Sequence, residues 1–312
     1  MKIPAHAKLL AMLMLTSAVS GTIGSPAPIV GDSAPDVFVP EDYQSSQSFG
    51  SSYLGVRMQA NFSKRVEVMN IPWVTSEFQN PGTGTCGDWQ GEFAGKLLDA
   101  LCWSWEYTGD AAAKARMDSL VSLLKGYQGT NGYLGTYPAS CRWTTWDVWN
   151  HQYDLVGLLH YYRATGDTAT LTACRRIGDL ICTTFGIGKL DIINSSWYHG
   201  MPSTSILESM VMLFRYTGDA KYRAFCDYIT TVWEESGGSK IVSSMLAGLD
   251  ITDVDTKAYE KMSTDACQQA LPEISELIRS AMHSRNGRLP KRSSKNKKSI
   301  KHTPDGLNEE LN

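Results

Sequence analysis

Long apolar runs are scarce in this chain, which limits the ways in which it can meet a membrane. The one marked run, Leu9–Val19, follows Lys2 and Lys8 and ends among small residues. A short basic start, a short apolar stretch and small residues form the pattern of a secretory signal peptide. The run is short for a helix that crosses a bilayer. We therefore expect residues 1–20 to direct export, giving a secreted or periplasmic protein with no membrane contact after cleavage; an uncleaved anchor is the alternative.

Several catalytic signatures are absent as well. The chain has no His-Glu-x-x-His pair, no glycine-rich phosphate loop that opens a helix, and no Gly-x-Ser-x-Gly elbow. These absences exclude the zinc helix of metalloproteases, the P-loop of nucleotide hydrolases and the nucleophile elbow of α/β-hydrolases.

A strong excess of one charge is also missing, because the net charge is only -3. Basic residues are nevertheless concentrated at 285–312, where eight Lys or Arg accompany three Asp or Glu. This run has few side chains that can fold or stack on bases, so we expect a disordered, solvated tail and no nucleic-acid partner. Binding to nucleic acid or to an anionic surface is the alternative. Residues 21–51, rich in Ser, Pro and Gly, are interpreted as a flexible lead-in.

Cysteine is present in an odd number, seven. Four cysteines fall in apolar helical stretches and are expected to be buried thiols: Cys102, Cys174, Cys182 and Cys226. Cys86 and Cys141 lie in loop-like segments and can form a disulfide in an oxidising compartment. Two free thiols remain the alternative for this pair.

The tripeptide Thr-Gly-Asp occurs three times, at residues 108–110, 165–167 and 217–219. Glycine can adopt the left-handed conformation that ends a helix. An aspartate directly after it can accept hydrogen bonds from the free N–H groups of the next helix. Each copy therefore predicts the tight corner of a helical hairpin.

The flanks of these corners carry helical patterns. Apolar residues recur every three or four positions around the first corner, as in Phe93, Leu97, Leu101 and Trp105 before it and Met117, Leu120, Val121 and Leu124 after it. This period is that of a helix, not of a strand. Three hairpins in series predict an all-α fold, either a solenoid or a closed α/α toroid.

Long segments rich in Gly and aromatic residues separate the hairpins. One runs from 126 to 138 and is followed by Trp143, Trp146 and Trp149, and another covers 186–202. Loops gathered at one end of a toroid line a cleft, and Trp and Tyr rings stack on the C–H faces of sugars. The tryptophans at 143–149 are therefore either part of a sugar-binding cleft or part of the core.

Several motifs in order and spacing resemble the β-L-arabinofuranosidases of glycoside hydrolase family 127. The resemblance covers about Ser52–Ser263 and is carried by WQGEFAGKLLDAL, GYLGTYP, TTWDVWNHQYDLVGLLHYYRATGD, CRRIGDLICTTFG and KAYEKMS. It implies an α/α barrel catalytic domain, in relatives followed by β-sandwich domains. It also implies removal of terminal L-arabinofuranose by a zinc-held cysteine thiolate, with a separate glutamate as general acid.

The sequence departs from this family pattern directly after Ser263. Cys267 is the one cysteine that follows, and it lacks the Glu-x-Cys setting that the family's zinc ligands have. We therefore identify no catalytic residue, no zinc ligand and no other cofactor site. About eight or nine predicted helices fall short of a ring of six hairpins. The expectation is an incomplete α/α toroid at 52–263, a divergent C-terminal helix at 264–284 and the basic tail.

Five residues are candidates for contact with sugar. The resemblance places a substrate-facing histidine at His151, and His199 lies in another stretch similar to the family. Glu92 opens a predicted helix beside the expected cleft, where the helix dipole stabilises a carboxylate. Trp149 and Asp147 complete the set. Each also has a structural interpretation: a satisfied histidine, a loop contact, a helix cap or a core side chain.

These observations leave three hypotheses for function. The first is a glycoside hydrolase that acts on arabinofuranosides. The second is a non-catalytic toroid fragment that binds an arabinofuranoside-type glycan. The third is a shortened product without function, which would expose an apolar helix face.

Overall fold

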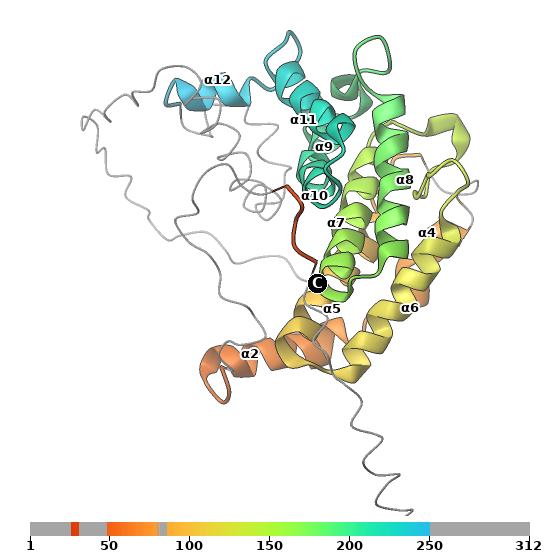
Figure 1. Ribbon diagram of the computed structural model, residues 1–312, viewed down its shortest axis with the longest axis vertical. Coiled ribbons are helices and arrows are strands. Elements are labelled where there is room, and N and C mark those ends of the chain that lie inside the picture. The colour runs from red at the N-terminus through yellow and green to blue at the C-terminus, as the bar shows by residue number, and fades with distance from the viewer. Residues whose placement is uncertain (1–25, 31–48, 80, 82–85, 250–312) are drawn as a thin grey trace, which may run out of the picture.

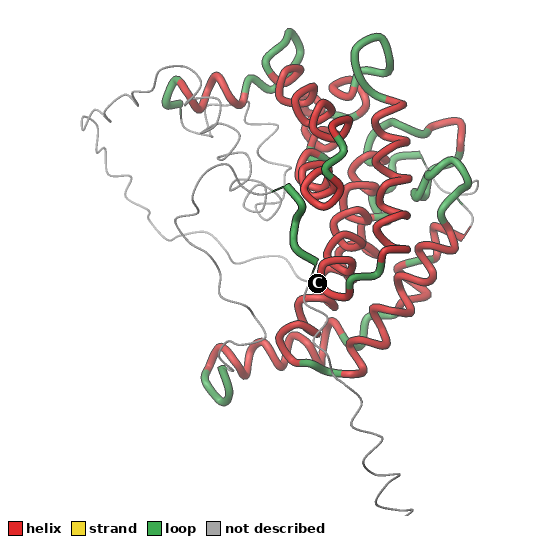
Figure 2. The backbone as a smooth tube through the Cα atoms, in the orientation of Figure 1, coloured by secondary structure: helices red, strands yellow, loops and turns green. Residues whose placement is uncertain are grey.

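The computed structural model describes residues 26–30, 49–79, 81 and 86–249. Over these residues the chain forms helices and no strand (Figure 2), which confirms the predicted all-α class. The signal segment 1–20, the helix at 264–284 and the tail at 285–312 lie outside the described residues, as does most of the lead-in 21–51.

The helices form a short N-terminal group followed by three long hairpins (Figure 1). In chain order they are α2 (Tyr53–Asn61), the π-helix η1 (Phe62–Val66), α3 (Ile71–Val74), α4 (Ser76–Gln79), α5 (Glu92–Thr108), α6 (Ala111–Tyr127), η2 (Ala139–Cys141), α7 (Asp147–Thr165), α8 (Thr168–Thr184), η3 (Ile192–Ser195), η4 (Tyr198–Gly200), α9 (Met201–Thr204), α10 (Leu207–Thr217), α11 (Ala220–Trp233) and α12 (Ile241–Leu246). None of the described helices is both long and apolar enough to cross a bilayer.

The three Thr-Gly-Asp corners have the predicted geometry. Each glycine is left-handed, with φ of 65° at Gly109, 73° at Gly166 and 65° at Gly218. Each following aspartate accepts a hydrogen bond from a backbone N–H in the first turn of the next helix, namely Asp110 from Ala112, Asp167 from Ala169 and Asp219 from Lys221. The repeated tripeptide therefore ends one helix and starts the next by short-range chemistry alone.

The hairpins stack so that α5, α7 and α10 lie side by side, and each packs against the helix that follows it, α6, α8 or α11. Helix α7 is buried on nearly every side. Because the corners follow α5, α7 and α10, the N-terminal ends of these helices gather at the opposite end of the stack. The long aromatic loops precede those ends, as the hairpin pattern predicts for part of an α/α toroid.

The closest helix contact joins α5 to α7 through two glycines. A Cβ at Gly95 would lie 2.1 Å from the carbonyl oxygen of Tyr153, and a Cβ at Gly157 would lie 2.5 Å from that of Gly95. Only glycine allows the backbones to approach this closely. The two helices therefore run in contact along their length.

Part of the lead-in is attached to this helical stack. The backbone N–H groups of Ile29 and Val30 both donate to the carbonyl oxygen of Arg215, at 2.9 and 3.1 Å. Ile29 also lies against Gly218 at the third corner. The segment 26–30 thus satisfies a carbonyl in the last turn of α10, where backbone acceptors have no helical partner.

Asp154 is buried at the α5–α7 contact. Neither of its carboxylate oxygens has a hydrogen-bond partner of normal geometry in the described residues. Burial raises the pKa of Asp154 well above the ordinary 3.8, and the nearby N–H of Gly95 offsets only part of this. The fold therefore favours the protonated acid. The stability that protonated Asp154 contributes is complete below the pKa that this residue has in the unfolded chain, and it is lost as pH rises toward the pKa that the residue has in the folded chain.

We predict that Asp154→Asn removes this pH dependence, because asparagine does not ionise. The free energy of unfolding of the variant relative to wild type should increase by about 1.4 kcal/mol per pH unit wherever only the unfolded Asp154 is ionised. Urea unfolding between about pH 4.5 and pH 8 measures this difference. The same substitution at exposed Asp227 controls for the loss of a surface charge. Parallel pH curves for wild type and Asp154→Asn would contradict the prediction.

Candidate functional site

Two of the candidate residues meet at the N-terminal ends of α5 and α7. The indole N–H of Trp149 donates to Oε2 of Glu92, and the Lys96 ammonium pairs with Oε1 of Glu92 at 2.9 Å. The same ammonium lies 5.8 Å from the ring centre of Trp149 and 4.2 Å from that of Tyr153. The Glu92 carboxyl group is therefore held by an indole N–H and an ammonium, and the ammonium lies over two aromatic faces.

These aromatic rings continue into a row that we name the aromatic wall, formed by Trp146, Trp149, Tyr153 and Trp197. Edge-to-face contacts link its members, with ring centres 5.0 to 5.7 Å apart. Trp149 and Tyr153, with Trp146 against them, form an apolar cluster separate from the main core. Trp197 remains 47% exposed. The wall thus runs from a buried carboxylate to solvent.

Asp147 and His151 form a second group, on the first turns of α7. Both side chains are fully buried. Nδ1 of His151 hydrogen-bonds the carbonyl oxygen of Asp147 at 2.8 Å, while Nε2 has no partner among the described residues. The rings of Tyr133 and Trp143 cover the imidazole, with centres 4.7 and 5.4 Å away. His151 therefore lies beneath the loop that precedes α7.

The Asp147 carboxylate holds this loop in place. It accepts hydrogen bonds from the Tyr133 hydroxyl at 2.8 Å and from the backbone N–H of Trp143 at 2.7 Å. Burial raises the pKa of Asp147, although His151 and these two donors oppose the shift. Burial also raises the pKa of the Tyr133 hydroxyl, and the Asp147 charge adds to that effect. The observed role of Asp147 is thus to anchor the loop.

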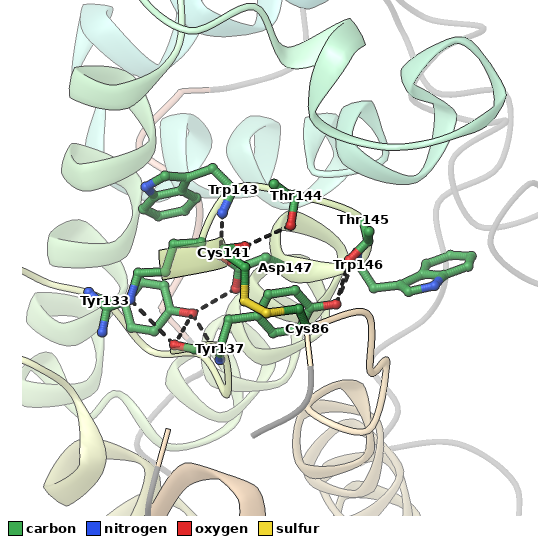
Figure 3. The surroundings of a disulfide bond; sticks show 10 residues. Cys86, Tyr133, Tyr137, Cys141, Trp143, Thr144, Thr145, Trp146 and Asp147 are labelled. Carbon is green, nitrogen blue, oxygen red and sulfur yellow. Dashed lines mark hydrogen bonds between the residues drawn. A yellow bond between two sulfur atoms is a disulfide. The ribbon is translucent and has the colours of Figure 1, made fainter. Parts of the chain in front are cut away.

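The loop before α7 is also fixed by a disulfide between Cys86 and Cys141 (Figure 3). The bond joins it to the segment that precedes α5, as one of the two sequence alternatives proposed. Trp143 and Thr145 have positive φ, 66° and 53°, which side-chain-bearing residues rarely adopt. The rings of Trp143 and Trp146 point to opposite sides of the loop (Figure 3). The tryptophans at 143–149 therefore divide between the buried histidine and the aromatic wall.

His199 stands apart from both groups. It is exposed, has a φ of 53°, and its Nδ1 hydrogen-bonds the carbonyl oxygen of Gly237 at 3.0 Å. Its observed partner therefore lies in the turn that follows α11.

Sequence reasoning missed several residues of this region. Lys96 carried a usable signal, because it follows Glu92 by four positions on one helix and such pairs are neighbours. For Trp197 and Tyr133, the sequence showed only that they lie in segments rich in aromatic residues. Their contacts depend on how separate loops pack, which no local spacing reveals.

The disulfide yields a stability prediction. Cys86 and Cys141 are 55 residues apart in sequence, and closing a loop of that length stabilises a fold by up to about 4 kcal/mol through loss of unfolded-chain entropy. The double variant Cys86→Ser with Cys141→Ser should lose free energy of unfolding on that scale in urea titrations without reductant. Cys182→Ser, which removes a free thiol, is the matched control. Equal stability of the double variant and wild type would refute the role of the bond.

Comparisons with known proteins agree on one family. The family model for the β-L-arabinofuranosidase GH127 catalytic domain matches residues 37–266. A solved GH127 β-arabinofuranosidase is 20% identical over 68% of this chain and 35% of its own, with a TM-score of 0.48. A GH127 β-L-arabinofuranosidase from Geobacillus stearothermophilus T6 is 20% identical over 62% of this chain and 32% of its own, with a TM-score of 0.45.

The chain thus spans about a third of the length of each of these two solved structures. None of the curated proteins matches the chain. Because the family model covers well over half of the sequence, the chain belongs to the β-L-arabinofuranosidase family GH127.

Proposed function

We propose that this chain recognises an arabinofuranoside-type glycan at the aromatic wall. The observation that carries the proposal is the wall itself, a row of touching rings that ends in the buried Glu92 carboxylate. Aromatic faces bind the C–H surfaces of sugars, and a fixed carboxylate accepts hydrogen bonds from hydroxyl groups. Membership of a family of arabinofuranosidases indicates the class of sugar.

The described residues do not fit the zinc–thiolate chemistry that resemblance to the family implies. No three of their His, Cys, Asp or Glu side chains are grouped as metal ligands would be. Burial raises the pKa of the thiols at Cys102, Cys174 and Cys226, and it raises that of Cys182 to about 12. These four cysteines are therefore neutral thiols near pH 7, which are poor nucleophiles. We assign recognition, not bond cleavage, to the described part of the chain.

Hydrolysis of terminal L-arabinofuranose is the second candidate, and family membership favours it. Its zinc-held thiolate nucleophile would have to come from outside the described residues. The two candidates share the same sugar and the same aromatic wall, and they differ only in whether a glycosidic bond is broken.

We also propose that the protein is exported. The N-terminal pattern at residues 1–20 motivates this, and the Cys86–Cys141 disulfide supports it, since such bonds persist in oxidising compartments. Processing by a signal peptidase, seen as a new N-terminus near residue 21 in mass spectrometry of secreted protein, is the expected result. Retention of Met1 in that protein would contradict it.

Calorimetric titration with a β-L-arabinofuranosyl disaccharide tests the recognition proposal. Wild type should bind, and Trp197→Ala should weaken binding about tenfold, because loss of one stacking ring costs about 1.4 kcal/mol. Tyr53→Ala, which removes an exposed ring on α2, is the matched control and should bind as wild type. No heat of binding for wild type would overturn the proposal.

The same samples, supplied with Zn²⁺, separate the two candidates. Release of L-arabinose that falls in Trp197→Ala would establish hydrolysis at the wall. Binding without release would establish recognition alone.

A further inference from the structure

A cavity lies on the C-terminal half of α5, between that helix and the α2–η1 segment. Its volume is about 340 Å³, within the range of small-molecule sites. Residues from Asp99 to Thr108 form one side, and residues from Met58 to Val66 form the other. Trp103 is eleven positions beyond Glu92 on α5, a separation of about 16 Å along the helix axis. The cavity is therefore separate from the aromatic wall.

The cavity lining combines aromatic faces with neutral polar groups. Phe62, Trp103 and Tyr107 supply rings, and Gln59 and Asn61 supply carboxamides. Trp103 is 40% exposed, and both amide residues are exposed, so the cavity opens to solvent. Rings that stack on C–H faces, beside amides that both donate and accept, are the groups that distinguish a sugar from a purely apolar ligand.

Asp99 adds a fixed acceptor to this lining. Its Oδ1 pairs with Nδ1 of His160 at 2.6 Å, and Nε2 of that ring lies 3.0 Å from Oε2 of Glu106. Arg163 donates to the same Glu106 oxygen at 2.8 Å and places its guanidinium 4.7 Å from the Trp103 ring centre. Helix α7 thus holds both the carboxylate and the indole from behind, which pre-organises them for a ligand.

The acidic and basic groups of this network balance one another in charge. Two carboxylates, Asp99 and Glu106, face the Arg163 guanidinium and the His160 imidazole. Burial lowers the pKa of His160, but the hydrogen bonds to Asp99 and Glu106 outweigh it and the net shift is upward. With its charges matched in this way, the network offers neither an anion nor a cation a strong partner.

We propose that this cavity is a second carbohydrate site, which binds one neutral saccharide unit between Trp103, Asp99 and the two carboxamides of α2. Trp103 and Tyr107 provide the stacking surface, and Asp99 accepts hydrogen bonds from ring hydroxyls. The site depends on its own lining and not on the aromatic wall. A chain with both sites would hold a branched or extended glycan at two points, which raises avidity.

Saturation-transfer NMR with a panel of neutral disaccharides, xylobiose, cellobiose, maltose and lactose, each at about 10 mM, tests the proposal in the range of millimolar affinity. At least one should bind wild type. Trp103→Ala should weaken that binding about tenfold or more, and Ser104→Phe, which places a ring in the cavity, should abolish it. Tyr53→Ala, on the exposed face of α2, should leave it unchanged, while Trp197→Ala reports any share of the binding that occurs at the aromatic wall. Circular dichroism of each variant confirms that the fold is retained.

The outcomes separate the two sites. If no disaccharide binds, or if Trp103→Ala and Ser104→Phe bind as wild type, the second site is refuted. A response that falls only in Trp197→Ala would assign all binding to the aromatic wall and also refute it. Tetramethylammonium or acetate that binds and is lost in Ser104→Phe would assign the cavity to a charged ligand instead. Asp99→Asn, which keeps shape and one acceptor, should weaken the saccharide several-fold.

Discussion

The backbone contact between α5 and α7 positions the carboxylates of both candidate sugar surfaces. Gly95 and Gly157 bring the two helices together where any side chain would collide with backbone atoms. This close approach aligns the helices in parallel along their length. Toward one end it brings Trp149 within hydrogen-bond distance of Glu92, and toward the other it does the same for His160 and Asp99. One helix pair therefore positions the carboxylates of both candidate sugar surfaces, and neither carboxylate requires a flexible loop to bring it into position.

Acidic side chains serve different purposes at the two ends of that pair. Near the N-terminal ends, Asp147 accepts hydrogen bonds from the loop that precedes α7, and these keep Trp143 against His151. Near the corners, Asp99 and Glu106 are matched by basic groups from α7. Asp154, between them, has no such partner and is favoured in its neutral form. Along this helix pair a carboxylate is thus met by opposite charge or by several donors, except at Asp154.

The sequence predicted what local chemistry decides. Residues that interact within a few positions of each other determine three predicted features: the glycine–aspartate corners, the helical class and the position of the long loops. The family was predicted from sequence motifs that occur in a set order and spacing along the chain. The partners of α7 could not be predicted in the same way, because a helix buried on nearly all sides shows no apolar stripe that points to its neighbours. The contacts of Lys96 with Tyr153 and of His160 with Asp99 join residues more than fifty positions apart, and only packing brings them together.

The corners also bear on the order in which the chain gains structure. Each hairpin carries its own stop and start signal, so its two helices can pair through contacts that are close in sequence, without help from the later hairpins. The α5–α7 contact forms only when the second hairpin arrives. The Cys86–Cys141 bond joins segments on either side of the first hairpin, and so closes a loop that contains both of its helices. The corners therefore favour assembly hairpin by hairpin, with the contacts between hairpins following.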